Sequence, residues 1–488
     1  MSRVRGAGVF LLGSMALVWN AAPAWAHAFG ARYDLPLPLG FYLSGAGAAV
    51  ALTFVIMAVF SSGTPRSGKD YGIDLTRTAV GAVLLNTYLR GFLSMIGVLL
   101  FVLIIATGAF GLQSPIKNFA PTMVWVIWWV GLAFFVALIG NIWPALNPWN
   151  TLFSLASRFL PPMGRARYPL ALGVWPSVAL FVIFAWFELV SESGDRPGNL
   201  VCLIAAYSVL TWTGMAAFGR RTWLSSGEVF NQAFGLLGRF APLAVVDQKR
   251  SVPRLVLRPY GAGLLPSAPV HSSMTFFVIV MLSTVTFDGF VETPLWSGFL
   301  DWLVRDQTVR PFLLWLQGHG FDLLAVVKTI ALLAFPCLFL GVYLGFCAVS
   351  IALAGPAVSF RDFANTLILS LVPIAIAYHV SHYLSYLMLA GQLIIPLSSD
   401  PFGWGWDLIG TAGYTMDITV INAKTVWYTA VVAIVLGHVL AVWIAHVQAV
   451  SLYRNTSRAL RSQVPMLVAM VLYTMISLWI LSQPIIEG

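Results

Sequence analysis

The chain has 488 residues, of which 59% are hydrophobic and 9% charged, and its mean hydropathy is +0.85. Soluble domains carry about 25% charged residues, so this composition excludes a water-soluble protein and predicts a polytopic membrane protein. The formal net charge of +9 comes from basic residues that lie in short segments between apolar stretches. That placement is typical of membrane topology signals, and we expect no nucleic-acid binding.

The first 26 residues have the pattern of a secretory signal peptide. They contain a basic start, an apolar core and an AxA-type cleavage site, at Arg3 and Arg5, residues 9–18 and Ala24–Ala26. Cleavage would leave His27 as the first residue and 27–488 as a single transmembrane helical domain, and an uncleaved first anchor is the alternative. A terminal histidine offers its amine and imidazole to copper, but such a site needs further imidazoles nearby.

Ten stretches after the signal are long and apolar enough to cross a bilayer, which needs about 20 residues. They lie at 38–60, 92–111, 119–140, 168–190, 199–218, 273–290, 322–353, 364–396, 425–449 and 464–483. The predicted fold is therefore all-α, a polytopic transmembrane helical bundle. The seventh and eighth stretches are long and contain Pro336 and Pro373, which predicts kinked helices or helices that extend beyond the bilayer.

The loops between these stretches indicate an orientation. If His27 lies outside, most Lys and Arg residues fall in inner loops, as the positive-inside rule requires. This predicts a bacterial cytoplasmic membrane protein with both mature termini outside. Residues 141–166 form a Trp-rich inner segment, and we expect the apolar piece at 228–243 to lie in the membrane interface. Residues 397–423 form an acidic, aromatic outer loop.

Four histidines lie in apolar surroundings in two of the last spans: His379, His382, His438 and His446. Imidazoles are rare in a bilayer because their nitrogens must be bonded where there is no water. His379, His382 and His438 can converge at one depth and hold a divalent metal, Zn, Cu or Fe. His446 lies about 12 Å further along its helix, too far to share that ion. Alternatively, each histidine bonds a neighbouring group and only joins helices.

Three charged residues also fall within predicted spans: Glu188, Asp288 and Lys328. All three lie in the outer half of the membrane, the side from which the histidines would be reached. A carboxylate there could ligate a metal or take a proton from water. Lys328 could pair with an acid or stabilise negative charge on a substrate. In the alternative interpretation the acids are solvated at the interface, and Lys328 extends to water.

The outer loop places aromatic and acidic side chains beyond the long eighth span, which carries Gln392. They are Asp400, Trp404, Trp406 and Asp407. Aromatic residues beside carboxylates could form a lid over a buried site for an apolar substrate. The alternative is an interfacial aromatic belt with solvated acids.

Several polar and Gly/Trp patterns are similar to those of a bacterial family of multi-span membrane proteins labelled fenitrothion hydrolase. The matching stretches are HAFGARYDLPLP at 27–38, LNPW at 146–149, AWFELV at 185–190, FGLLGRFAPL at 234–243, TFDGF at 286–290, and the segment from SHYLSYLMLAGQ at 381–392 through SSDPFGWGWDLIGT to GHVLAVWIAH at 437–446. The resemblance covers essentially the whole mature chain. Ser381, where the family tends to have Ala, and His379 depart from the pattern. The shared positions are Asp288, His382, Gln392, Asp400, Asp407, His438 and His446.

The resemblance implies hydrolysis of lipophilic aryl phosphotriesters, in which an activated water attacks phosphorus. His382 and His438 would then hold the metal, and Asp288 or Asp407 would ligate it or act as the base. A transporter or metal permease could use the same buried groups as its pathway. A structural or assembly subunit, in which the polar groups only pack helices, is the third possibility.

Overall fold

The computed structural model describes residues 35–60, 72–159, 166–246, 253–265, 268–453 and 455–486. The predicted signal peptide and His27 lie outside these residues. Ten helices in the described ranges are long and apolar enough to cross a membrane, and each coincides with a predicted span. The prediction of an all-α, multi-span membrane protein is thereby confirmed, and its spanning helices contact the lipid bilayer.

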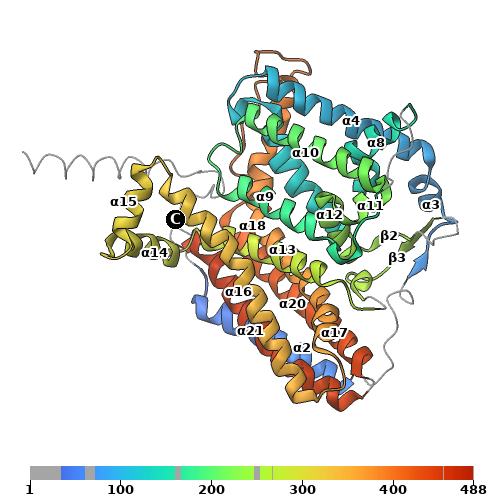
Figure 1. Ribbon diagram of the computed structural model, residues 1–488, viewed down its shortest axis with the longest axis vertical. Coiled ribbons are helices and arrows are strands. Elements are labelled where there is room, and N and C mark those ends of the chain that lie inside the picture. Colours follow the sequence, from blue (N-terminus) through green and yellow to red (C-terminus); the bar gives the residue numbers. More distant parts are fainter. Residues whose placement is uncertain are drawn as a thin grey trace, which may run out of the picture.

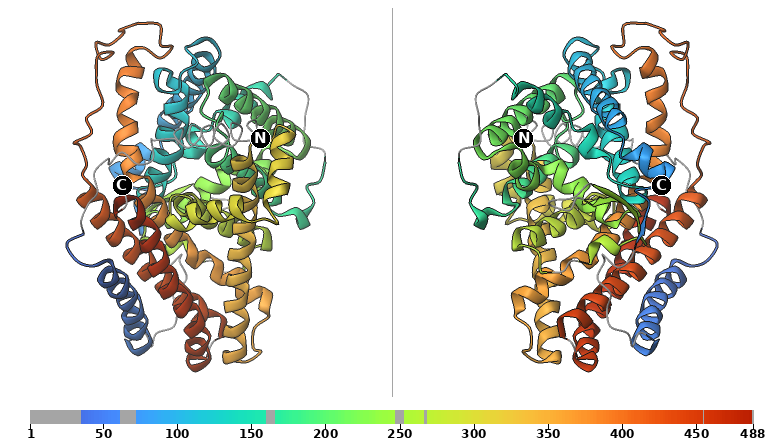
Figure 2. Two further views of the ribbon diagram at one scale, coloured as in Figure 1. Left: turned by 90° about the vertical axis from the view of Figure 1, so that its left-hand side faces the viewer. Right: turned by 90° about the vertical axis from the view of Figure 1, so that its right-hand side faces the viewer.

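Eight of the ten spans are single helices. They are α2 (Leu39–Phe60), α4 (Thr87–Phe110), α9 (Trp175–Leu189), α10 (Pro197–Phe218), α13 (Ser272–Phe290), α16 (Leu323–Ala354), α20 (Ala423–Tyr453) and α21 (Thr456–Ile486). α16 runs without a break through Pro336. In Figure 1, α16, α20 and α21 run side by side in the lower half of the molecule. α2, the first described helix, packs against α21 and α20 near the end of the chain, as Figure 2 also shows.

The other two spans are composite. The third consists of α5 (Phe119–Pro121), a π-helical stretch η2 (Thr122–Gly131) and α6 (Leu132–Leu138). The eighth consists of α17 (Phe360–Leu367), a 3-10 turn η5 (Ile368–Leu371), α18 (Val372–Ala390), η6 (Gly391–Leu393) and α19 (Ile394–Ser399). η5 ends directly before α18, whose first turn contains Pro373, so the predicted irregularity of the long eighth span lies where proline cannot donate a helical hydrogen bond.

Shorter elements connect the spans. They are α3 (Ala79–Leu84), η1 (Pro115–Lys117), α7 (Trp143–Leu146), α8 (Pro148–Ala156), η3 (Leu170–Leu172), α11 (Arg220–Ser226), α12 (Val229–Phe240), η4 (Ala262–Leu264), α14 (Pro294–Arg305) and α15 (Arg310–Gly318). A small antiparallel sheet of order β1-β3-β2 joins Ile73–Asp74, Arg254–Leu257 and Leu243–Val246. Leu257 of β3 pairs with both Ile73 and Leu243.

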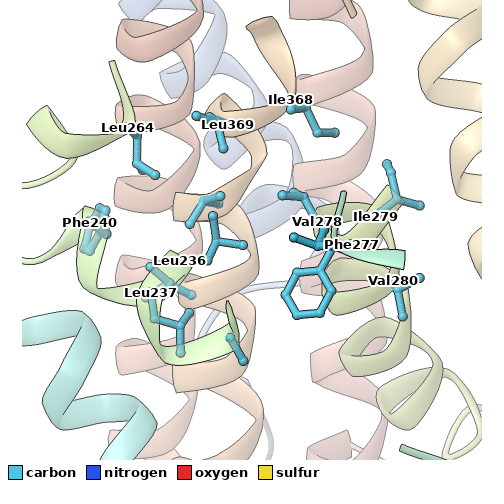
Figure 3. Packing of buried hydrophobic residues seen from close by; sticks show 14 of the residues in the cluster. Leu236, Leu237, Phe240, Leu264, Phe277, Val278, Ile279, Val280, Ile368 and Leu369 are labelled. Atoms are coloured by element: carbon cyan, nitrogen blue, oxygen red, sulfur yellow. The ribbon is translucent and has the colours of Figure 1, made fainter. Parts of the chain in front are cut away.

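The apolar piece at 228–243, which we expected in the membrane interface, lies in the protein core instead. Most of α12 is buried, including Phe234, Leu236 and Leu237, and α12 packs against α6, α9 and α18. Figure 3 shows Leu236 and Leu237 among buried side chains of α13 and η5. The interface prediction is wrong because neighbouring helices, rather than headgroups, cover the apolar face of α12.

Candidate functional site

Asp288 and His382 form a direct pair between two spans. The Nε2 atom of His382, on α18, lies 2.9 Å from the Oδ2 atom of Asp288, near the end of α13. The hydroxyl of Tyr383, the next residue on α18, donates to the same carboxylate oxygen at 2.6 Å. The His382 side chain is 8% exposed and that of Asp288 22%. The structure therefore brings two residues singled out in the sequence into one acid–base pair, with Tyr383 as a second donor.

Close helix contact positions this pair. α18 packs against α13 on one side and against α20 on the other. Gly289, directly after Asp288, faces Tyr378 on α18, and a Cβ atom at Gly289 would lie 2.6 Å from the Tyr378 hydroxyl. Only a residue without a side chain lets the two backbones approach so closely. The short distance between α13 and α18 in turn lets a short aspartate side chain reach His382.

A small cavity adjoins the pair. Its volume is about 40 Å³, and its lining includes Glu188, Thr284, His379 and Tyr383. A cavity needs roughly 10–15 Å³ of this measure to hold one water, so it has room for a few water molecules. The carboxylate of Glu188 is close enough to Asp288 for an electrostatic interaction. A second carboxylate thus reaches the same region from α9.

His379 lies on the cavity side of α18. Its ring contacts Trp129 of η2 and Phe134 of α6, with centroids 6.2 and 5.7 Å away, and it also contacts Tyr383 at 4.8 Å. Its Nε2 atom is buried and has no hydrogen-bond partner among the described residues. An unsatisfied buried polar atom beside a cavity is typical of a site that takes a water or ligand.

His438 faces a different neighbour. Its Nδ1 atom lies 2.8 Å from the Ile434 carbonyl oxygen, and its ring contacts Tyr473 of α21 at 6.0 Å. The Tyr473 hydroxyl is 2.5 Å from Thr286 Oγ1 on α13. In the described part of the chain, no three His, Cys, Asp or Glu side chains form a group that could hold a metal ion. The ligand set His379, His382 and His438 stays a prediction.

His446 and Lys328 lie apart from this cluster. His446 Nδ1 is 3.0 Å from Gln463 Oε1 on α21, so this histidine joins two helices. Lys328 lies half-buried on α16, and within the described ranges no ion pair joins it to Asp288 or Glu188. The catalytic role predicted for Lys328 has no contact to support it.

The acids of the outer loop organise that loop. Asp400 accepts hydrogen bonds from the Trp404 and Gly405 amides at 2.9 and 2.7 Å. Asp407 accepts from the Ser399 hydroxyl at 2.6 Å and the Ala412 amide at 3.0 Å.

These donors lower the pKa of Asp407, with the Ser399 hydroxyl as the largest cause. Over the described residues, neither Asp400 nor Asp407 contacts Asp288 or His382. The catalytic role predicted for Asp407 therefore has no geometric support either.

The remaining loop side chains also contact each other or the end of the eighth span. Gln392 binds the loop through the Tyr414 hydroxyl and the Asp417 backbone. Trp404 stacks on Phe402 with centroids 4.3 Å apart, and Trp406 meets Trp404 edge-on.

Sequence reasoning missed the tyrosines around the pair. Tyr378, Tyr383 and Tyr473 were not singled out, because tyrosine is common in membrane proteins and is no signal on its own. The one available signal was position: Tyr383 follows His382 directly, and Tyr378 precedes it by one helical turn.

Comparison with known proteins adds no identity. No protein-family model, no curated protein and no solved structure matches this chain. The resemblance to the fenitrothion hydrolase family stays a prediction, and what is shown is a multi-span helical membrane protein with a buried Asp–His–Tyr cluster.

Proposed function

We propose that the Asp288–His382–Tyr383 cluster is a proton-transfer centre, and that this protein uses it to hydrolyse lipophilic aryl phosphotriesters inside the membrane. The observation that carries the proposal is the 2.9 Å contact between His382 Nε2 and Asp288 Oδ2. A carboxylate can only accept a hydrogen bond, so Nε2 carries the proton and Nδ1 keeps its lone pair. An imidazole oriented in this way is a general base.

The reaction follows from that tautomer. His382 Nδ1 takes a proton from water as the water oxygen attacks phosphorus, and the P–O–aryl bond breaks. The proton held by His382 then passes to the departing aryl oxide, which leaves as a phenol, and the other product is a dialkyl phosphate. Asp288 stabilises the imidazolium formed during the attack. Tyr383, which donates to the same carboxylate oxygen, fixes the orientation of Asp288.

Substrate entry requires a movement. The cavity of about 40 Å³ admits water, whereas pockets for drug-sized ligands occupy about 300–1,000 Å³. A triester dissolved in the bilayer would displace apolar side chains around the cavity, such as Phe181 and Met281. Opening and closing of this kind is common in enzymes that exclude water from a reactive site.

The proposal includes no metal step. The three histidines predicted as ligands face different neighbours: Trp129 and Phe134, Asp288, and Tyr473. This arrangement does not fit a common ion, so no metal-bound water enters the reaction. Metal binding at His382 is a separate expectation, to be tested by metal analysis of the purified protein.

Proton-coupled transport is the second candidate. It is favoured by the electrostatic interactions that connect Glu188, Asp288, His379 and His382 and by a cavity sized for water. Chains of such groups within a membrane serve as proton relays in pumps and transporters. The same cluster would then accept and release protons while the helices rearrange.

One experiment separates the two functions. The protein would be reconstituted into vesicles and assayed for phenol release from an aryl phosphotriester and for proton flux with an internal pH dye. We expect turnover in the wild type and at least a hundredfold loss in His382→Gln and Asp288→Asn, in line with general-base catalysis. Glu192→Gln removes an exposed carboxyl outside the cluster and serves as the control.

The outcomes are distinct. Substrate-dependent proton flux without turnover, lost in the same two variants, would assign transport. Absence of both activities, or activities unchanged in His382→Gln, would refute the proton-transfer proposal. The predicted orientation, with both mature termini outside a bacterial cytoplasmic membrane, is part of the proposal and can be checked by labelling single cysteines placed in loops on either side.

A further inference from the structure

A large cavity far from the Asp288–His382 pair in the sequence is lined by three arginines. Its volume is about 530 Å³, and its polar lining residues include Arg90, Arg220, Arg221, Asn147, Asn150 and Asn231. The size falls within the range of about 300–1,000 Å³ that is common for small-ligand sites. No function discussed so far uses this arginine pocket.

The arginine pocket is built from the ends of spanning helices. Arg90 lies in the first turn of α4, and Arg220 and Arg221 open α11 directly after the end of α10. Asn147 and Asn150 belong to the start of α8. The ends of apolar spans lie at the depth of lipid headgroups. The charge distribution along the sequence places these ends on the inner face.

The charge of the pocket is uncompensated. No acidic side chain lines it, and among the described residues no ion pair involves Arg90, Arg220 or Arg221. Three guanidinium groups around one cavity repel each other unless an anion lies between them. Since arginine stays protonated in proteins, the positive charge persists at any physiological pH.

The one carboxylate behind the pocket wall points away from the arginines. Glu228 is completely buried, and its oxygens accept hydrogen bonds from the Tyr207 hydroxyl at 2.5 Å and the Asn231 amide at 2.7 Å. The Asn147 side chain donates to it at 3.4 Å. Glu228 thereby fixes Asn147 and Asn231, two residues of the pocket wall, without neutralising the arginines.

We propose that the arginine pocket binds a phosphate group, supplied by the headgroup of an anionic phospholipid. The planar guanidinium fork matches phosphate oxygens in pairs, and asparagine side chains add neutral donors. Basic pockets between transmembrane helices on the cytoplasmic side suit anionic headgroups. A soluble phosphate compound has the same chemistry, and the test distinguishes the two sources. This inference does not rest on the proposed hydrolase activity.

The test measures binding of three probes to the full-length protein in detergent micelles. Phosphatidylglycerol, phosphatidylcholine and inorganic phosphate are each titrated, and intrinsic tryptophan fluorescence reports the melting temperature and the apparent Kd. We expect phosphatidylglycerol to bind and to raise the melting temperature, phosphatidylcholine to do neither, and free phosphate to bind more weakly than phosphatidylglycerol. Each charge-assisted contact is worth about a tenfold change in Kd.

Two triple variants separate the pocket from general basic charge. The pocket variant carries Arg90→Gln, Arg220→Gln and Arg221→Gln, and the matched control carries Arg361→Gln, Arg458→Gln and Arg461→Gln, which lie exposed outside the pocket. We expect phosphatidylglycerol affinity to fall at least a hundredfold in the pocket variant and to change little in the control. If the pocket variant does not fold, Arg220→Gln alone should weaken binding about tenfold.

Three results decide the matter. Equal weakening in both triple variants, or unchanged binding in the pocket variant, would overturn the proposal. Tighter binding of free phosphate than of phosphatidylglycerol, lost only in the pocket variant, would keep the phosphate site and reject the lipid as its source. Selective loss of phosphatidylglycerol binding in the pocket variant supports the proposal as stated.

Discussion

Replacement of Gly437 tests how tightly the helix that carries His382 is packed. Gly437 lies on α20 opposite α18, and an added Cβ atom would come 2.5 Å from the Ala377 Cβ and 2.8 Å from the Pro373 carbonyl oxygen. Ordinary van der Waals contact begins at 3.4 Å, so Gly437→Ala must separate the two helices by roughly 1 Å. Pro373 contributes a backbone atom, which cannot turn aside as a side chain can.

The magnitude follows from two opposing effects. Overpacking of this kind costs about 1–3 kcal/mol, and the higher helix propensity of alanine offsets up to about 1 kcal/mol. We expect a net loss of about 1–2 kcal/mol. Because α18 also carries His382, a displacement of about 1 Å would disturb the contact with Asp288 and could lower turnover about a hundredfold.

Thermal unfolding in detergent, followed by tryptophan fluorescence, measures the effect. The matched control is Gly345→Ala on α16, where an added Cβ atom would meet no atom within 4 Å. We expect Gly437→Ala to melt at a lower temperature than the wild type and Gly345→Ala to melt at the same temperature or higher. Equal melting temperatures for the two variants would refute the close-packing argument.

Two further predictions concern acids outside the spans. Glu228→Ala should destabilise the protein by about 3 kcal/mol or more, because the Tyr207 hydroxyl and the Asn231 amide lose their buried acceptor, whereas Glu228→Gln keeps an acceptor and should lose less; unfolding in denaturant measures both. The lowered pKa of Asp407 means that its stabilisation of the outer loop is complete above the unfolded value near 3.9 and is lost as the pH falls below it. Tryptophan fluorescence of the loop should change over that acidic range in the wild type, and the change should be absent in Asp407→Asn.

The ten spans could be predicted because hydropathy is a local property of the sequence. A stretch of about 20 apolar residues requires a spanning helix whatever surrounds it. The burial of α12 could not be predicted in this way. Its apolar face suits the membrane interface equally well, and only the packing of α6, α9 and α18 against it decides between the two.

The site could be predicted in its members but not in its pairing. Asp288 and His382 were singled out as polar groups in apolar spans, because such groups are costly in a bilayer. Which of the histidines meets the carboxylate depends on how α13 rotates against α18, and the sequence does not encode that in any local pattern. His379 and His382 are three residues apart, yet one meets Trp129 and the other Asp288.

The central claim is that Asp288 and His382 act as one unit, and a double-mutant cycle on activity tests it most directly. Turnover or proton flux would be measured in vesicles for Asp288→Asn, His382→Gln and the double variant. The account predicts that the double variant loses no more activity than the worse single variant, because each substitution already disables the shared centre. Losses that multiply, as they do for independent residues, would contradict it.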